Sequence, residues 1–389
     1  MKKRKVLAAV LLIAVLAAGC GEEIEQKGTA VPSEGTETKI ETEADEDSQI
    51  KNGDKISVQL TDKVALEAVV QLPEAGLEGI ELCRVRTVGY EGELAASLLS
   101  VETPLEQWEQ RKGDGGYAPE IRYHYEGELS VGSVKKTGSI ITGFGLGLQT
   151  DHWNFCDDYF YTYGIGGQKF PLFDYPIDEE LPSMSMEEAK QAGKEYLEEV
   201  LGAERAEPVR IYAYSHEGMA QYQKEQYEHP ENYFTGKPQE LELTEWTEAD
   251  DCYEIEYEQY FQGIPVLSNL VSRKDDAYVP GGISTVGITP DGIEYLNLEP
   301  YYERIDGKET ELAPLEEVLA GLQRKFDMMI IGTTILDEMK LIYFPLPVSV
   351  DPAKPYEFDL LPVWQFGFGQ EDYREYIYIN AVDGSELSY

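Results

Sequence analysis

The sequence is poor in the residues and motifs on which catalysis usually depends. Among its 389 residues there are only four histidines and four cysteines. It does not contain the G-x-S-x-G turn of a serine hydrolase. The 74 acidic residues are so numerous that a pair of carboxylates gives no indication of a glycosidase. We therefore assign no catalytic residue and expect a protein that is not an enzyme.

Basic residues are scarce as well. The 32 Lys and Arg residues stand against 74 Asp and Glu residues, which gives a formal net charge of −42. Such a charge repels the phosphates of nucleic acids and the head groups of anionic lipids. We therefore expect no nucleic-acid binding, and the charge favours basic, neutral or cationic partners.

No apolar run is long enough to cross a bilayer, but the N-terminus carries a shorter one. In "MKKRKVLAAVLLIAVLAAGC" four basic residues precede 13 apolar residues, whereas a membrane-spanning helix needs about 20. Small residues and Cys20 follow, as in a bacterial lipobox, although Ala17 stands where a large apolar residue is usual. We interpret residues 1–19 as a lipoprotein signal peptide and Cys20 as the lipidation site. The alternative is an ordinary cleaved signal that happens to contain a cysteine.

Residues 20–54 have the composition of a flexible segment after a lipid anchor. They are rich in Glu, Thr, Ser and Gly, with few large apolar residues, so they predict a disordered acidic tether. Two acyl chains on Cys20 would give stable attachment to a leaflet. The expected location is the extracellular face of the cytoplasmic membrane, with the membrane contacted only through the lipid anchor.

Two predicted β-hairpins share one pattern. "ISTVGITPDGIEYLNL" and "YIYINAVDGSEL" each place an Asp-Gly pair between β-type runs, at Asp291-Gly292 and Asp383-Gly384. Both residues of such a turn tolerate positive φ, which makes Asp-Gly a strong hairpin signal. A Pro-Val pair precedes each turn, Pro265-Val266 in the first case and Pro362-Val363 in the second. The C-terminal half therefore predicts a tandem repeat.

A helix is predicted at the start of each repeat. Ser185 and Glu188 have capping-box spacing before "MEEAKQAGKEYLEEVLG", and Pro314 precedes "LEEVLAGLQRKFD" with apolar residues on one face. Each unit thus reads helix-strand-strand-strand. We place the first unit at 183–300, with a Tyr-rich insertion at 203–250, and the second at 301–389.

Residues 55–180 predict a separate β-rich α+β domain. "VALEAVVQL" (64–72) and "IELCRVRTV" (80–88) favour strands, and "TPLEQWEQRK" (103–112) favours a short helix. The expected fold class is α+β: antiparallel sheets with packed helices, in tandem units after this β-rich domain.

The C-terminal half resembles PepSY-like modules, in particular the YycH/YycI-type regulatory proteins. The resemblance depends mainly on the segments "LPVWQF" and "YINAVDGSEL", and "GIPV" and "ITPDGIEYL" show it more weakly. The layout also resembles that of uncharacterised lipoproteins from gut Gram-positive bacteria. The resemblance covers roughly residues 183–389. It implies PepSY-like units, no catalytic residue, and a sensor-kinase ectodomain as the partner. YycH/YycI-type proteins usually carry an N-terminal transmembrane helix where this chain has a lipobox.

The stretch "DHWNFCDD" holds His152, Cys156, Asp157 and Asp158, which are all metal-capable residue types. His124, His216 and His229 show no matching spacing, so we interpret this stretch as a satisfied surface cluster and assign no metal and no cofactor. The glycines in "TGFGLGLQT" are not followed by a helix pattern, so they favour close backbone packing over nucleotide binding.

The remaining cysteines are Cys83, Cys156 and Cys252, an odd number. A disulfide between Cys83 and Cys156 and three buried free thiols are both open.

The expected function is a surface-anchored, non-catalytic binding or regulatory module for an envelope or extracellular protein. The alternative is a solute- or glycan-binding lipoprotein of an uptake system. Calcium bound by scattered carboxylates stays open.

Overall fold

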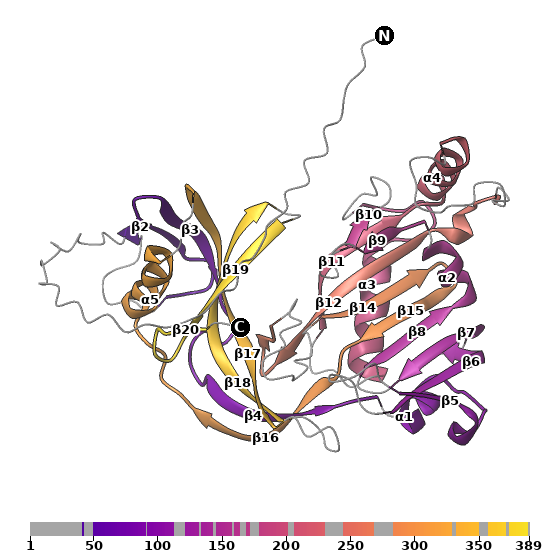
Figure 1. The fold of residues 1–389 in the computed structure, drawn as a ribbon, viewed down its shortest axis with the longest axis horizontal. Coiled ribbons are helices and arrows are strands. Elements are labelled where there is room, and N and C mark those ends of the chain that lie inside the picture. The colour runs from indigo at the N-terminus through magenta and orange to yellow at the C-terminus, as the bar shows by residue number, and fades with distance from the viewer. Residues whose placement is uncertain are drawn as a thin grey trace, which may run out of the picture. The chain divides into compact units, whose positions relative to one another are not determined.

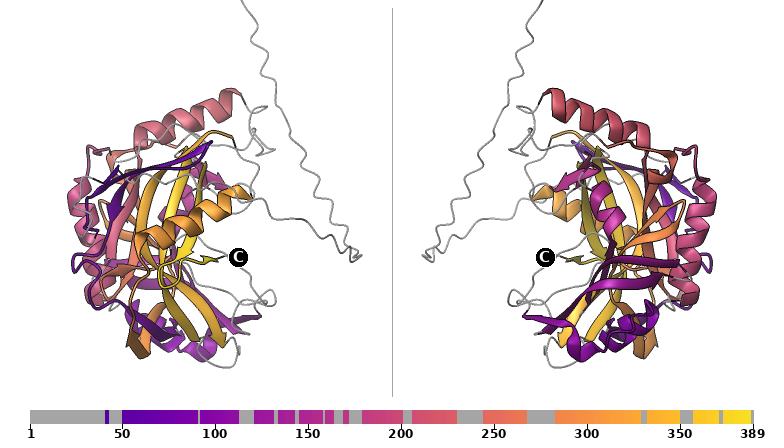
Figure 2. Two further views of the ribbon diagram at one scale, coloured as in Figure 1. Left: turned by 90° about the vertical axis from the view of Figure 1, so that its left-hand side faces the viewer. Right: turned by 90° about the vertical axis from the view of Figure 1, so that its right-hand side faces the viewer.

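The computed structural model (Figures 1 and 2) is dominated by two nine-stranded sheets. By its internal contacts the chain divides into Met1–Thr38 and Lys39–Tyr389. Everything described below belongs to the second of these. The structure describes residues 41–42, 50–90, 92–112, 121–131, 134–142, 145–157, 159–163, 169–171, 179–200, 206–229, 244–267, 283–328, 332–349, 357–370 and 373–387.

The first sheet joins strands from the two ends of the sequence. Its strands are β1 (Glu41–Thr42), β2 (Lys55–Thr61), β3 (Val64–Gln71), β4 (Glu81–Val88), β16 (Tyr301–Glu309), β17 (Thr334–Ser349), β18 (Glu357–Gln370), β19 (Tyr373–Asn380) and β20 (Glu386–Leu387). The order is β1-β2-β3-β17-β18-β19-β20, and β4 pairs with both β16 and β18. All these pairs are antiparallel except β3 with β17.

β18 changes its partner along one edge, and a proline marks the change. Residues 363–370 pair with β19, whereas residues 357–360 pair with β4. Pro362 lies between the two stretches, where a missing N–H costs no ladder hydrogen bond on that edge, and its carbonyl accepts from Ala381. Figure 2 shows β17 and β18 as long strands that run side by side. The proline of the predicted Pro-Val pair is therefore accommodated inside a strand.

The second sheet is built from the middle of the sequence. Its strands are β5 (Glu109–Lys112), β6 (Ile121–Val131), β7 (Val134–Thr142), β8 (Leu146–Thr150), β11 (Ala206–Tyr214), β12 (Cys252–Phe261), β13 (Ile264–Pro265), β14 (Ile283–Thr289) and β15 (Gly292–Leu298). The order is β11-β12-β14-β15-β8-β7-β6-β5, with β13 on β12. A separate two-stranded sheet pairs β9 (Tyr161–Tyr163) with β10 (Lys169–Pro171).

Five α-helices lie among the described residues: α1 (Gly92–Leu98), α2 (Asp151–Asp157), α3 (Met186–Glu195), α4 (His216–Glu228) and α5 (Leu315–Asp327). A π-helical turn (Tyr196–Val200) extends α3, and 3₁₀ turns form at Leu105–Gln107 and Glu248–Asp250. Within this part of the chain, no helix has the length and apolar character needed to span a membrane.

The two faces of the second sheet carry separate apolar clusters. Alternate β12 residues Tyr253, Ile255 and Tyr257 point to the cluster under α3. Cys252 belongs to an aromatic cluster on the other face, together with Trp153 of α2. We call the latter the aromatic cluster; its buried members are Trp153, Cys156, Tyr159, Phe160, Tyr212, Tyr214, Met219, Tyr222, Trp246 and Cys252.

Several predicted elements are confirmed. The hairpins at Asp291-Gly292 and Asp383-Gly384 form between β14 and β15 and between β19 and β20. The predicted helices at 186 and 315 are α3 and α5, and the Ser185 hydroxyl accepts from the Glu188 backbone as a cap should. Trp364 and Phe366, which follow the second Pro-Val pair in β18, are buried.

The predicted α+β fold class, with helix-packed tandem units after a separate β-rich domain, is wrong. The described chain is β-rich, and its two large sheets carry only five helices between them. Strands of 55–88 join the first sheet with the C-terminal strands, while strands of 109–150 join the second. These pairings link residues far apart in sequence, and local periodicity contains no information about them.

The helix predicted at 103–112 is also wrong. Only the 3₁₀ turn Leu105–Gln107 forms there, and β5 follows it at once. Trp108 is buried because it stacks on Tyr125 of β6 and its indole N–H donates to the Thr103 carbonyl. Pairing with β6 outweighs the weak local helix preference.

Gly321 lies where α5 meets the turn that follows β19. A Cβ added there would lie 2.1 Å from the Gly384 carbonyl oxygen, and Gly384 itself has a φ of +65°. The Gly384 carbonyl is a backbone group, and α5 is held by its own packing, so neither the turn nor the helix can move aside at low energetic cost.

We therefore expect Gly321→Ala to destabilise the protein by about 1–3 kcal/mol, although alanine normally stabilises a helix interior relative to glycine. Chemical denaturation measures the change. Gly332→Ala is the matched control, since nothing lies within 4 Å of the added Cβ. Equal stability of the two variants would contradict the close contact between α5 and the turn.

Candidate functional site

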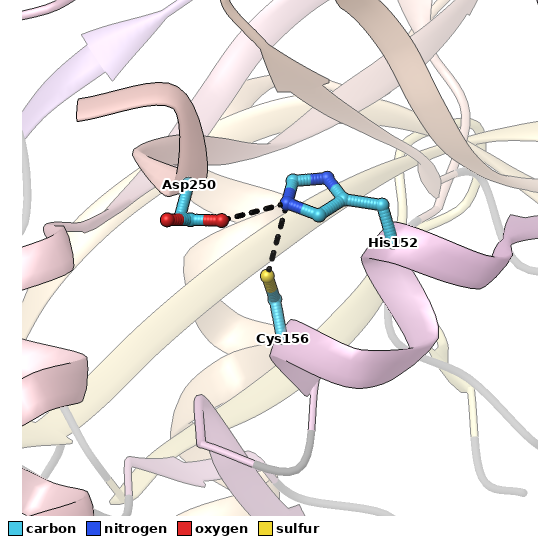
Figure 3. A group of neighbouring side chains, drawn as sticks. All are labelled: His152, Cys156 and Asp250. Carbon is cyan, nitrogen blue, oxygen red and sulfur yellow. Dashed lines mark hydrogen bonds and ion pairs between the residues drawn. The ribbon is translucent and has the colours of Figure 1, made fainter. Parts of the chain in front are cut away.

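His152 and Cys156 are brought together by the short helix α2. The helix begins at Asp151, directly after β8, and its four-residue spacing places both side chains on one side. His152 Nε2 lies 3.6 Å from Cys156 Sγ (Figure 3). Cys156 is buried in the aromatic cluster, so it fixes one end of the pair inside the protein.

Asp250 comes to this pair from a different part of the sequence. It ends the 3₁₀ turn before β12, and its carboxylate accepts from the Thr247 backbone N–H at 2.7 Å in a capping box. The other carboxylate oxygen lies 3.1 Å from His152 Nε2 (Figure 3). The donor atoms of His152, Cys156 and Asp250 all lie within 4.8 Å of one another.

Glu294 fixes the other side of the imidazole. It lies at a register shift between β14 and β15, where Gly287 pairs with Tyr295 and Ile288 with Ile293, so it is the extra residue of a β-bulge. Such a bulge re-aims a side chain. Its carboxylate lies 2.7 Å from His152 Nδ1, accepts from the Thr150 hydroxyl at 3.0 Å, and accepts from Lys136 Nζ at 2.5 Å. Glu294 is only 3% exposed, so its charge is held inside the protein.

The pKa values in this group follow from its burial and hydrogen bonds. Burial alone would raise the pKa of Glu294, but hydrogen bonds from His152 and Lys136 outweigh it and lower the pKa to about 2. Hydrogen bonds to Cys156, Glu294 and Asp250 raise the pKa of His152 to about 11. Burial raises the pKa of the Cys156 thiol. With no metal bound, the group is therefore an imidazolium between two carboxylates, beside a neutral thiol.

Three chemistries can be considered for this geometry. Cys156, His152 and Glu294 have the order of a nucleophile, a base and its orienting carboxylate. The nucleophile role is disfavoured because Cys156 is 1% exposed and its thiolate is disfavoured by burial. An ion-pair network and a metal site both fit, since the side chains of His152 and Asp250 are 35% and 19% exposed.

The structure brings together only some of the metal-capable residues that were considered in the sequence. His152 and Cys156 come together, Asp157 is not part of the donor group, and Asp158 lies outside the described residues. Cys20, the expected lipidation site, also lies outside them, as do residues 1–19 and most of 20–54. His124 and His216 lie near other carboxylates, at Glu109 and Asp251.

The three cysteines Cys83, Cys156 and Cys252 are buried and free. The alternative of three buried thiols is therefore confirmed, and the disulfide between Cys83 and Cys156 is not formed. Cys83 lies on β4 of the first sheet, 3.4 Å from the Gln262 side-chain oxygen, whereas Cys156 belongs to α2 at the second sheet.

Sequence reasoning missed Asp250 and Glu294. Asp250 is 98 residues from His152, and Glu294 is 142 residues from it. The only local signal was the T-x-x-D spacing of Thr247 and Asp250, which predicts a cap but not a ligand.

Comparison with known proteins gives the fold and no function. No protein-family model matches the chain, and no curated protein matches it. An uncharacterized protein from Eubacterium rectale ATCC 33656, whose crystal structure is known, is similar with a TM-score of 0.58 and 15% sequence identity. The match covers 86% of this chain and 93% of that chain. At this identity the likeness concerns the fold alone.

Proposed function

We propose that the protein is a lipid-anchored, extracellular binding module that acts on an envelope protein without catalysis. The single observation that carries the non-catalytic part is the burial of Cys156. Its thiol lies beside a base and an orienting carboxylate, yet Cys156 is only 1% exposed, which disfavours attack on a substrate. The expected signal peptide at residues 1–19, followed by Cys20, and the charge of −42 support a location outside the cytoplasm and a partner that is not nucleic acid. The resemblance to YycH/YycI-type regulators favours the ectodomain of a sensor kinase as the partner.

Two of the edge strands are poor places for strand addition. The edge strand β16 has a bulge between Arg304 and Asp306, and the edge strand β11 has one between Pro208 and Arg210. Bulges and charges on an edge oppose pairing with another chain. We place the proposed contact surface on a sheet face and not on these two edges.

One such face lies on β6, β7 and β8 of the second sheet. Ile141 of β7 is 43% exposed there, while its neighbour Ile140 is buried in the cluster on the opposite face. In register with Ile141 lie His124 on β6 and Gly147 on β8. We place the contact on this face because Ile141 is a large apolar side chain that is exposed within a paired strand of the sheet.

Affinity capture tests this proposal. The mature chain with Cys20→Ser, immobilised without lipid, is expected to enrich one envelope protein from solubilised membranes, and mass spectrometry identifies it. Ile141→Glu should abolish the enrichment. Val69→Glu is the matched control, since Val69 of β3 is 46% exposed but lies in the first sheet. A folded, monodisperse sample that retains nothing above a blank resin would contradict the proposal.

The second candidate function is binding of a solute or glycan for uptake. It is favoured by Phe155 of α2, which is 42% exposed and stacks on Trp246 with ring centroids 5.2 Å apart. Exposed aromatic rings stack on sugar faces. Saturable binding to a glycan panel that is lost in Phe155→Ala and kept in Ile141→Ala would support this function instead.

A further inference from the structure

We propose that His152, Cys156 and Asp250 bind one Zn²⁺ ion through His152 Nε2, Cys156 Sγ and one carboxylate oxygen of Asp250. Imidazole, thiolate and carboxylate are all zinc ligands, with bonds of about 2.0–2.3 Å. In a tetrahedron these bonds place neighbouring donor atoms roughly 3.3–3.6 Å apart. The Nε2–Sγ and Nε2–Oδ1 distances of 3.6 and 3.1 Å are close to this. The third pair, Sγ and the Asp250 carboxylate oxygen, lies within 4.8 Å, so all three donors face a common point that an ion can occupy (Figure 3).

The surroundings of His152 are those of a zinc-ligating histidine. Such a residue usually donates its second ring N–H to a carboxylate, which fixes the tautomer and the ring orientation. Glu294 lies 2.7 Å from Nδ1, and it is itself held by Lys136, Thr150 and Thr289. Nε2 is thereby directed at Cys156 and Asp250. Asp250 is fixed in turn by the capping box at Thr247.

Three protein ligands leave one position of the tetrahedron open. The exposed parts of His152 and Asp250 give solvent access to the site, while Cys156 closes it toward the core. The fourth ligand is therefore water or a donor atom of a partner. Cys252 is completely buried and is not part of the donor group. On binding, the protons of the Cys156 thiol and of His152 Nε2 pass to the buffer.

The rival explanation is a metal-free ion-pair network among the same residues. Both explanations require His152, Asp250 and Glu294, but only metal binding requires the sulfur of Cys156 as a ligand. A spectroscopic signature of a metal–sulfur bond therefore separates them.

The mature, unlipidated chain with Cys20→Ser, kept reduced, is titrated with Zn²⁺ against a chelating indicator and separately with Co²⁺. We expect one tight site per chain. Bound Co²⁺ should show the visible bands of tetrahedral coordination and a near-ultraviolet thiolate charge-transfer band. Zn²⁺ should then displace the cobalt and remove both.

Substitutions assign the ligands. Cys156→Ser should remove the charge-transfer band, and Asp250→Asn should weaken Zn²⁺ binding while Asn keeps an oxygen for the cap at Thr247. Asp157→Asn and Cys252→Ser are the matched controls, an acid and a thiol next to the site in sequence but outside the donor group. Glu294→Gln, checked for native circular dichroism, should weaken binding by about 10–100-fold.

The proposal is overturned if wild-type protein binds neither ion. It is also overturned if Cys156→Ser keeps the cobalt spectrum, or if a control variant loses binding as fully as Asp250→Asn does. Since Asp250 is partly exposed, its variant stays informative even where Cys156→Ser fails to fold.

Discussion

Trp153→Ala is expected to lower the free energy of unfolding by about 3–5 kcal/mol, as found for large buried aromatic residues. Trp153 is completely buried in the aromatic cluster. Its ring stacks on Tyr295 with centroids 5.2 Å apart and meets the edge of Phe160 at the same distance. A Cβ added to Gly287 of β14 would lie 2.3 Å from the indole, so the ring lies directly on the backbone of the second sheet. Its removal leaves a cavity that neither the sheet nor α2 can fill.

Urea denaturation followed by far-ultraviolet circular dichroism measures this loss. Phe155→Ala, two residues further along α2, is the matched control, because Phe155 is 42% exposed and should cost far less. Trp153→Phe should recover part of the stability, since the indole N–H makes no hydrogen bond among the described residues. Similar losses for Trp153→Ala and Phe155→Ala would contradict the packing of α2 on the sheet.

Glu258→Ala is expected to cost about 3 kcal/mol, since removal of one partner leaves the other charge buried. Glu258 of β12 accepts from Lys340 of β17 at 2.6 and 2.8 Å, which joins the second sheet to the first. The two side chains are 6% and 18% exposed. The Lys340 ammonium would lose its charged acceptor while it stays largely shielded from water.

The comparison is with an exposed pair of the same type. Lys135 and Glu128 are 2.7 Å apart but 68% and 66% exposed, so Glu128→Ala should change stability by less than about 1 kcal/mol. The double variant Glu258→Leu with Lys340→Met should restore much of the loss, because no charge is then left buried. If the double variant lost as much stability as the sum of its two single variants, Glu258 and Lys340 would not be energetically coupled.

Much of the local structure could be predicted from the sequence. The Asp-Gly hairpins, the caps of α3 and α5 and the apolar stripe of α5 are set by residues within a few positions of one another. Tyr253, Ile255 and Tyr257 alternate with acidic residues, which is typical of a strand, and all three are buried in β12. These features depend on backbone conformation and periodicity, which short stretches of sequence determine.

The sheet arrangement and the completed site could not be predicted in this way. Nothing near β3 indicates that it pairs in parallel with β17. In the same way, nothing near Asp250 singles it out among 74 acidic residues as the neighbour of His152. Glu294 is directed at His152 by a β-bulge, and Asp250 is placed beside His152 by a 3₁₀ turn. Both positions depend on the pairing of the second sheet, which no short stretch of sequence specifies.

Some paired strands of the first sheet are synthesised at widely separated times. The Arg84–Asp359 ion pair, which joins β4 to β18, closes across 275 residues. At about 5–20 residues per second, β4 emerges from the ribosome roughly 15–55 s before its partner exists. The apolar faces of β2, β3 and β4 thus have no native sheet to join for that interval. Nascent chains stopped before β17 therefore expose apolar strand faces, and such surfaces make incomplete chains prone to aggregation.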